Sequence, residues 1–206
     1  MELDQCIEKR ASYRSYNDKK VAWDDLIAIL NVARLAPSSG NLQNWSFIIV
    51  QKPELKEEIA KSALNQNWMN QAPVLIIVCS RLENIKRHYG ERGEMLYSIQ
   101  NCASAVNNIL LKATDLGIAS CWINAFDEDA VKRILKVPLG VRPQAIITLG
   151  YSNEKIEKLK RYELDLLIHF DEWNGKKSEG IFPLKQHKHE IKEGISNTSK
   201  QGKSFL

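Results

Sequence analysis

The sequence predicts an α+β fold, a three-layer α/β/α sandwich in which helices cover both faces of one sheet. Two observations predict it. Strand and helix patterns alternate in the order β-α-β-α-β-α-β within a helical frame. The apolar run 72–79 does not alternate with polar residues, which is typical of an interior strand covered on both faces. The pattern leaves the strand directions open.

Periodicity and turn residues place the elements in chain order. They are a helix over 3–11, a helix from Asp24 to Pro37, a strand over 47–50, a helix over 54–64, an amide-rich loop over 65–71, a strand over 72–79, a charged connection over 81–93, a helix over 94–116, a strand over 118–125, a helix over 126–136 and a strand over 145–151.

Several residues justify these boundaries. Acidic residues open the helices at Asp4, at Asp24 and at Asp127, where they offset the helix dipole. Pro53 suits a first helical turn, and Gly117 suits a helix end. The longest helix carries apolar residues at three- and four-residue spacing, which fits a core helix, a subunit interface, or both.

Composition excludes several classes of protein. Of 206 residues, 44% are hydrophobic and 26% charged, which is ordinary for a soluble globular protein. No apolar run approaches the roughly 20 residues that span a bilayer, so we expect a cytoplasmic protein with no membrane partner. Much of the net charge of +4 lies beyond Gly175 among few aromatics, so we expect no nucleic-acid partner.

The same change in composition sets the predicted domain boundary. We expect one domain over 1–175 and a polar, lysine-rich C-terminal tail or arm over 176–206. The tail contains His187 and His189, but an H-x-H on a flexible segment is more typical of solvated histidines than of metal ligands. No metal site is predicted.

The four cysteines show no metal-binding or redox spacing. Cys79, Cys102 and Cys121 lie in apolar contexts, which predicts buried free thiols and a reducing compartment. Cys121 has no flanking base that would support a nucleophile.

Two polar stretches are candidate binding sites. The turn 38–43 offers short hydrogen-bonding side chains between a helix and a strand, although an ordinary connecting loop has the same composition. Arg10, Ser12 and Arg14 supply two fork-shaped donors and a hydroxyl suited to a phosphate or carboxylate, although a solvated helix end fits equally well. Phosphate-loop, dinucleotide, metalloprotease and hydrolase motifs are absent from the sequence, so any chemistry is expected from a cofactor.

Six motifs occur together in a characteristic order: R-A-S-Y-R at 10–14, A-P-S-S-G-N-L-Q-N-W at 36–45, A-P-V-L-I-I-V-C at 72–79, R-H-Y-G-E-R-G at 87–93, G-I-A-S-C-W at 117–122 and G-Y at 150–151. In order and spacing they resemble the FMN-dependent nitroreductase family, which consists of NAD(P)H-dependent flavin oxidoreductases. The resemblance covers about residues 3–173. It implies a homodimer with two FMN sites at the subunit interface.

The resemblance also assigns FMN ligands. Arg10 and Ser12 would contact the phosphate and ribityl chain, and Arg14 the pyrimidine edge of the flavin. The other implied ligands are Ser38, Ser39, Asn41 and Gln43, some from the partner subunit; Asn65 or Asn67 at the ring; Asn124 and Ala125, through backbone N–H groups near flavin N5 and O4; and Lys160 and Arg161 at the phosphate. Asn44 replaces the usual proline, which is expected to loosen the turn and alter substrate-side contacts while FMN binding survives.

The implied reaction is ping-pong. NADH or NADPH delivers hydride to flavin N5, and a nitroaromatic, quinone or similar small acceptor then takes the electrons. Because the flavin carries the chemistry, no catalytic side chain is predicted. Two alternatives stay open: another reaction on the same fold, such as reductive dehalogenation, reduction of activated alkenes or flavin fragmentation, and a non-enzymatic FMN-binding protein.

Overall fold

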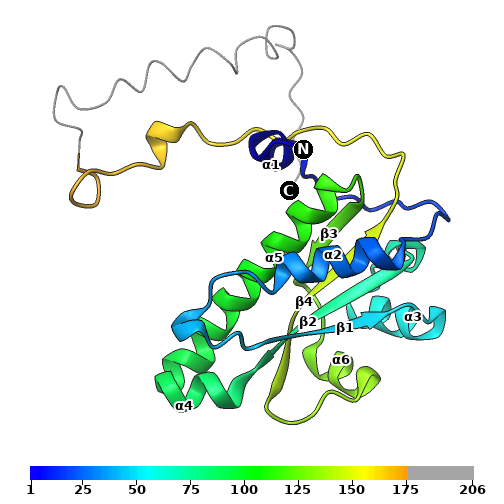
Figure 1. Ribbon diagram of the computed structural model, residues 1–206, viewed down its shortest axis with the longest axis horizontal. Coiled ribbons are helices and arrows are strands. Elements are labelled where there is room, and N and C mark those ends of the chain that lie inside the picture. The colour runs from blue at the N-terminus through cyan, green and yellow to red at the C-terminus, as the bar shows by residue number, and fades with distance from the viewer. Residues whose placement is uncertain (176–206) are drawn as a thin grey trace, which may run out of the picture. The chain divides into compact units, whose positions relative to one another are not determined.

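The computed structural model describes residues 1–175, and the chain divides into two units, Met1–Lys158 and Leu159–Leu206. The first unit contains, in chain order, α1 (Leu3–Lys9), α2 (Trp23–Ala33), β1 (Trp45–Val50), α3 (Pro53–Ser62), β2 (Val74–Arg81), α4 (Leu82–Arg92), α5 (Ser98–Asp115), β3 (Ala119–Ile123), α6 (Glu128–Leu135) and β4 (Val141–Gly150) (Figure 1). Of the second unit, only 159–175 are described, with one short 3-10 turn at Leu164–Leu166. The predicted tail 176–206, with His187 and His189, lies outside the described residues.

The four strands form one sheet in the order β1-β2-β4-β3, and every neighbouring pair is antiparallel. The strand directions, which the sequence left open, are thereby settled. In this order β1 and β3 are the two edge strands. Trp45 lies opposite Ser80 at one end of the sheet, and Ser120 shares a row with Leu149 and Val74 at the other.

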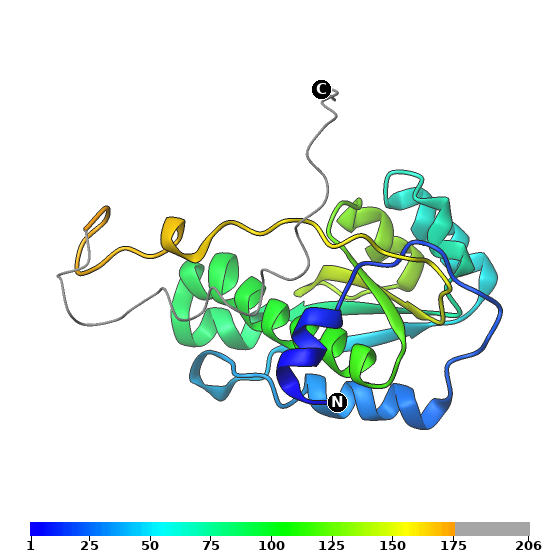
Figure 2. The same cartoon turned by 90° about the horizontal axis from the view of Figure 1, so that it is seen from above.

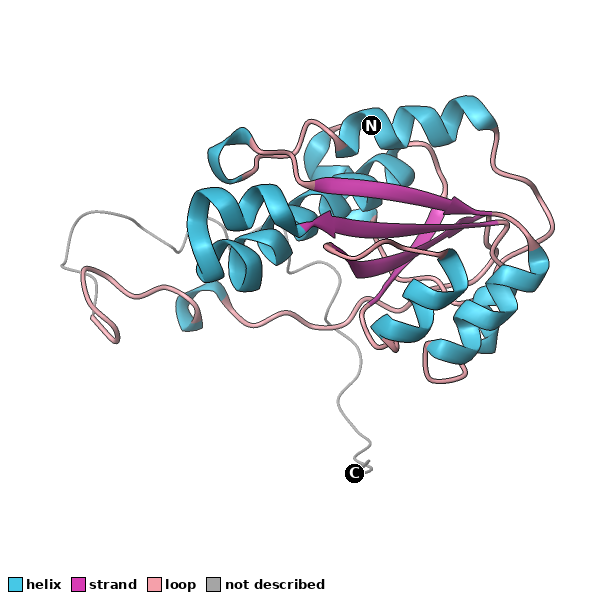
Figure 3. Cartoon of the chain, turned by 90° about the horizontal axis from the view of Figure 1, so that it is seen from below, coloured by secondary structure: helices cyan, strands magenta, loops and turns pink. Residues whose placement is uncertain are grey.

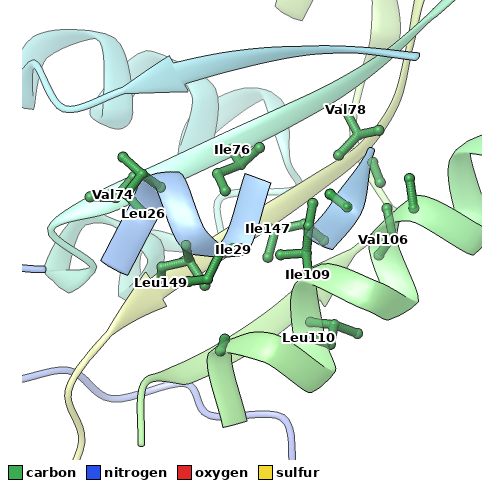
Figure 4. Packing of buried hydrophobic residues seen from close by; sticks show 14 of the residues in the cluster. Leu26, Ile29, Val74, Ile76, Val78, Val106, Ile109, Leu110, Ile147 and Leu149 are labelled. Atoms are coloured by element: carbon green, nitrogen blue, oxygen red, sulfur yellow. The ribbon is translucent and has the colours of Figure 1, made fainter. Parts of the chain in front are cut away.

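Helices cover both faces of the sheet, as predicted (Figures 2 and 3). Leu26 and Ile29 of α2 and Ile109 of α5 pack on one face, against Ile76 and Ile147 (Figure 4). On the other face, the buried hydrophobic residues of α3 and α6 are Ile59, Ala60 and Val131, which pack with Leu75, Ile77 and Ile146. Successive residues of β2 thus point into two cores, which explains why its sequence is continuously apolar.

The main departure from the predicted elements is α4. Residues predicted as a charged connection form a helix in which Ile85 is the buried residue, too sparse a pattern to predict from periodicity. The regular part of the next helix begins at Ser98 rather than at residue 94, after a π-helical turn over Gly93–Tyr97. In α5, Ile99 is 41% exposed, whereas the other apolar residues of the stripe are mostly buried: Cys102, Val106, Ile109, Leu110 and Ala113.

Two further boundaries differ for local reasons. β4 begins at Val141 rather than at residue 145, because Pro143 lies opposite Cys79, where a bulge shifts the register and tolerates a proline. α2 ends at Ala33, before the predicted stop at Pro37.

All four cysteines are buried free thiols, as predicted for three of them. Burial raises the pKa of Cys79 and of Cys102 to about 12. Among the described residues, no helix is long and apolar enough to cross a membrane, and no cluster of three potential metal ligands occurs.

Candidate functional site

The segment after α1 runs along the edge strand β3 as an extended arm, residues 10–17. Ser12 forms an isolated parallel bridge with Ser120, and the N–H of Tyr13 donates to the Ser120 carbonyl at 3.0 Å. The phenol of Tyr16 lies 2.6 Å from Thr148 Oγ1. Burial raises the pKa of Tyr16, so its neutral hydroxyl remains a hydrogen-bonding anchor for the arm.

The arm carries three predicted FMN ligands at the edge of β3: Arg10 and Ser12 for the phosphate and ribityl chain, and Arg14 for the pyrimidine edge of the flavin. Ser12 is fixed there by its bridge with Ser120. Burial raises the pKa of the nearby Cys121 thiol, while the positive charges of Arg14 and Arg10 and a hydrogen bond with Ser12 act in the opposite direction. Within residues 1–175 neither arginine forms an ion pair. Their guanidinium groups remain available to an anion.

A carboxylate fixes the backbone of the arm without neutralising its side chains. Glu154 Oε2 accepts the backbone N–H groups of Arg14 at 2.9 Å and Ser15 at 3.1 Å. The guanidinium carbon of Arg14 lies 6.0 Å from the centre of the Trp68 ring, within range of a cation–π contact. Arg14 thus lies beside the amide-rich loop 65–71, in which the resemblance places an FMN ligand at Asn65 or Asn67.

That segment is held by a buried lysine. Nζ of Lys56 donates to the carbonyl oxygens of Asn70 at 3.1 Å and Ala72 at 2.7 Å. Burial lowers the pKa of Lys56, which is expected when a cation has carbonyl dipoles rather than a carboxylate as partners. Asn65 is exposed at the start of the segment, with φ 57, and its carbonyl accepts the N–H of Asn67.

Asn124 and Ala125 follow the end of β3 and are exposed. Their backbone N–H groups have no acceptor among residues 1–175, so they are free to donate to a ligand. Just beyond them the N–H of Asp127 donates to the Ser62 carbonyl at 2.8 Å, which ties this loop to the end of α3.

The polar turn 38–43 has an unusual backbone. Gly40, Asn41 and Gln43 all have positive φ, at 56°, 54° and 44°. This conformation is uncommon for residues other than glycine, and asparagine tolerates it better than most. Ser38 Oγ accepts the Gln43 N–H at 3.0 Å, and the Gln43 amide donates to Asn41. Tyr89 lies so close to Gly40 that an added Cβ would be 2.5 Å from its hydroxyl oxygen.

Asn44 does not loosen this turn, and that expectation was wrong. It is 1% exposed and lies in a chain of buried hydrogen bonds. Asn101 Nδ2 donates to Asn44 Oδ1 at 2.7 Å, and Asn44 Nδ2 donates to Ser80 Oγ at 2.7 Å. The N–H and hydroxyl of Ser39 both donate to Asn101 Oδ1, at 3.0 and 3.2 Å. A proline at position 44 would remove the side-chain bonds.

The arm and the turn occupy diagonally opposite corners of the sheet. The turn leads into β1 at the row of Trp45 and Ser80, whereas the arm binds the other edge strand at Ser120, in the row of Val74. Six residues of β2 separate these rows, which is about 20 Å along the strands, and three strand spacings of about 4.8 Å separate the edges. Figures 1 and 2 show both segments, in shades of blue, at opposite ends of α5.

Comparison with known proteins identifies the family. The family described as "Nitroreductase family" matches residues 7–68 and 60–151. The chain belongs to the nitroreductase family. It is therefore an oxidoreductase of the family that contains NAD(P)H nitroreductases and FMN reductases, and the predicted α+β nitroreductase-like fold is confirmed.

Two relatives and one solved structure illustrate the similarity. A "Putative NADH dehydrogenase/NAD(P)H nitroreductase" of Methanothermobacter thermautotrophicus is 32% identical over 84% of this chain and 88% of its own. An "FMN reductase [NAD(P)H]" of Bacillus subtilis is 32% identical over 72% of this chain and 59% of its own. An "FMN-dependent Nitroreductase" from Clostridium difficile has a TM-score of 0.68 and 29% identity, over 82% of this chain and 98% of the other.

Sequence reasoning missed several residues that shape the candidate site. Asn101 offered a signal, because it is a polar residue close to the apolar stripe of the longest helix. Glu154 offered none, since its contacts with the arm join distant parts of the chain. Tyr89 belongs to the motif at 87–93, but nothing in the sequence indicated its contact with Gly40. Lys160 and Arg161 belong to the second unit, so their predicted role at the phosphate stays a prediction.

Proposed function

We propose that this protein is an FMN-dependent oxidoreductase that transfers electrons from NADH or NADPH to nitroaromatics, quinones or similar small acceptors. The observation that carries the proposal is the cluster of Arg10, Ser12 and Arg14 at the edge of β3, with both guanidinium groups unpaired within residues 1–175. Family membership and relatives with FMN and NAD(P)H in their names support it.

The donor set fits FMN. The guanidinium group of Arg10 and the hydroxyl of Ser12 suit a phosphate and its neighbouring hydroxyls, since planar forked donors bind phosphate oxygens in pairs. The turn supplies the amides of Asn41 and Gln43, exposed and held in a fixed conformation, which suit the polar edge of a flat ring. Arg10 and Ser12 would hold the phosphate end, and Arg14 the ring end.

Bound FMN would provide the redox chemistry, accepting hydride and then passing on electrons, which amino-acid side chains cannot do. The positive charge of Arg14, which lies 6.0 Å from the centre of the Trp68 ring, would stabilise negative charge on a nearby ligand. Free N–H groups of Asn124 and Ala125 would orient a ligand at the end of β3. No side chain needs to act as an acid or base.

We also propose a homodimer. Within one copy, the arm and the turn lie at opposite corners of the sheet, so residues of both cannot surround one ligand. A second copy related by a twofold axis would bring the turn of each protomer to the arm of the other, which gives two identical sites.

An absorbance spectrum of the purified protein tests the proposal. We expect flavin absorbance, or its appearance on reconstitution with FMN, and bleaching on anaerobic titration with NADH or NADPH. Subsequent addition of a quinone or nitroaromatic should restore the oxidised spectrum. A colourless protein that FMN does not reconstitute would refute the proposed function.

A further inference from the structure

Four side chains link the two stems of the turn 38–43 to the interior. The hydrogen bonds run from Ser39, near the start of the turn, through Asn101 to Asn44, directly after the turn, and on to Ser80. Asn101 belongs to α5, and Ser80 is a residue of β2. The turn is therefore closed at its base by a helix residue that contacts both stems.

The geometry and burial of this chain make it rigid. Asn44, Asn101 and Ser80 are 1%, 4% and 0% exposed, so water does not compete for their hydrogen bonds. Each amide both donates and accepts, and the bonds from Asn101 to Asn44 and from Asn44 to Ser80 are both 2.7 Å long. The backbone carbonyl of Asn44 also accepts the Arg81 N–H at 2.7 Å. Shortening either amide would leave a buried partner unpaired.

The turn needs such an anchor because its backbone is strained. Asn41 and Gln43 have positive φ, a conformation that persists only where the surroundings impose it. Their side chains are exposed, so the anchor cannot be explained by packing of these two residues.

We propose that Asn44 and Asn101 are positioning residues for the FMN site: the buried amide pair sets the conformation in which the turn 38–43 presents its side chains to the ligand. The inference rests on the proposed function for the identity of that ligand. Neither residue contacts FMN in this proposal. They act by fixing Ser39 and the end of the turn.

The test uses Asn44→Ala, Asn101→Ala, the double variant, and Asn108→Ala as the matched control. Asn108 lies on the same helix and its amide donates to the Val32 carbonyl at 3.1 Å, remote from the turn. FMN affinity is measured by quenching of flavin fluorescence, and exchange of the Ser39 and Gln43 amide hydrogens is measured without FMN. The exchange readout does not depend on any bound cofactor.

We expect each single variant to weaken FMN binding about tenfold and to speed Ser39 exchange by a similar factor, since one buried hydrogen-bonding partner is lost in each. The double variant should bind FMN about as tightly as whichever single variant has the lower FMN affinity, because the two amides act as one unit. Asn108→Ala should change neither readout.

Two outcomes would overturn the inference. The first is an FMN affinity of both variants equal to that of Asn108→Ala; if Ser39 exchange is nevertheless faster in the variants, the amide pair is merely structural. The second concerns the parent protein and so applies even if a variant fails to fold. It is a Ser39 amide that exchanges as fast as that of Gly40, which has no acceptor within residues 1–175. A parent that binds no FMN would instead refute the proposed function.

Discussion

Two complementary double variants test whether each site takes its arm from one protomer and its turn from the other. The first variant carries Arg10→Ala and Arg14→Ala, and the second carries Asn41→Ala and Gln43→Ala. If sites are shared between protomers, a dimer of either variant alone lacks half of the ligand set in both sites. Each variant alone should therefore retain little FMN.

The expected recovery follows from the symmetry. In each mixed dimer one site receives both altered segments and the other receives neither, so about half of the sites in purified mixed dimers are intact. Before purification, random pairing makes about half of all dimers mixed, which leaves about one quarter of all sites intact. Because the arm and the turn of one protomer lie about 20 Å apart along the strands, no chain can restore its own site.

The two chains are co-expressed with different tags, and mixed dimers are isolated by tandem affinity purification. FMN content and NADH oxidation are measured for these dimers and for each variant alone. The matched control co-expresses the arm variant with a chain carrying all four substitutions, which leaves no intact site in any pairing. Mixed dimers with no more FMN than this control would refute the shared-site reasoning.

Three further predictions concern single features. Arg10→Ala and Arg161→Ala should each weaken FMN retention by about 1.5 to 3 kcal/mol, the value of a charged hydrogen bond, whereas Arg34→Ala at the end of α2 should not; equal retention in all three would show the phosphate assignment to be wrong. Cys79 and Cys102 have pKa values raised from 9.0 to about 12, so the stability they contribute is complete below pH 9.0 and declines as the pH rises toward 12. The free energy of unfolding, measured in urea between pH 10 and 11, should therefore fall less steeply with pH after Cys79→Ala or Cys102→Ala, by about 1.4 kcal/mol per pH unit. An unchanged dependence on pH would contradict the assigned burial. Gly40→Ala and Gly117→Ala should each lose about 1 kcal/mol of stability because both glycines have positive φ, but only Gly40→Ala should also loosen FMN, since only its Cβ would meet Tyr89; equal FMN loss in both would exclude a role for that contact.

The fold was largely predictable because its core follows local rules. The continuously apolar run 72–79 predicts a central strand, since the side chains on both faces of this strand are buried. The helix α4 was not predictable, because it has little buried apolar surface and is interrupted at Gly90, where φ is 58°. A helix with a weak apolar face is stabilised mainly by tertiary contacts, which the periodicity of its own sequence does not show.

The candidate site divides in the same way. Arg10, Ser12 and Arg14 are close in sequence, so their suitability as ligands for an anion could be predicted without a structure. The role of Asn44 could not be predicted, because its hydrogen-bonding partners lie 57 and 36 positions away and its side chain is buried rather than exposed to a ligand. The asparagine at position 44, which the sequence suggested would loosen the turn, is a buried residue that anchors it.

The arm has a consequence for the order of folding. Its hydrogen bonds to Glu154 join residues 140 positions apart, so it docks only after nearly the whole first unit has been brought together. Closing so long a loop has an entropic cost that grows with its length, and such contacts form late. By the same reasoning the arm should be the first part to open under mild denaturant. Under increasing denaturant, bound FMN would then be released before the sheet unfolds. Loss of the absorbance of bound flavin would therefore precede loss of secondary structure.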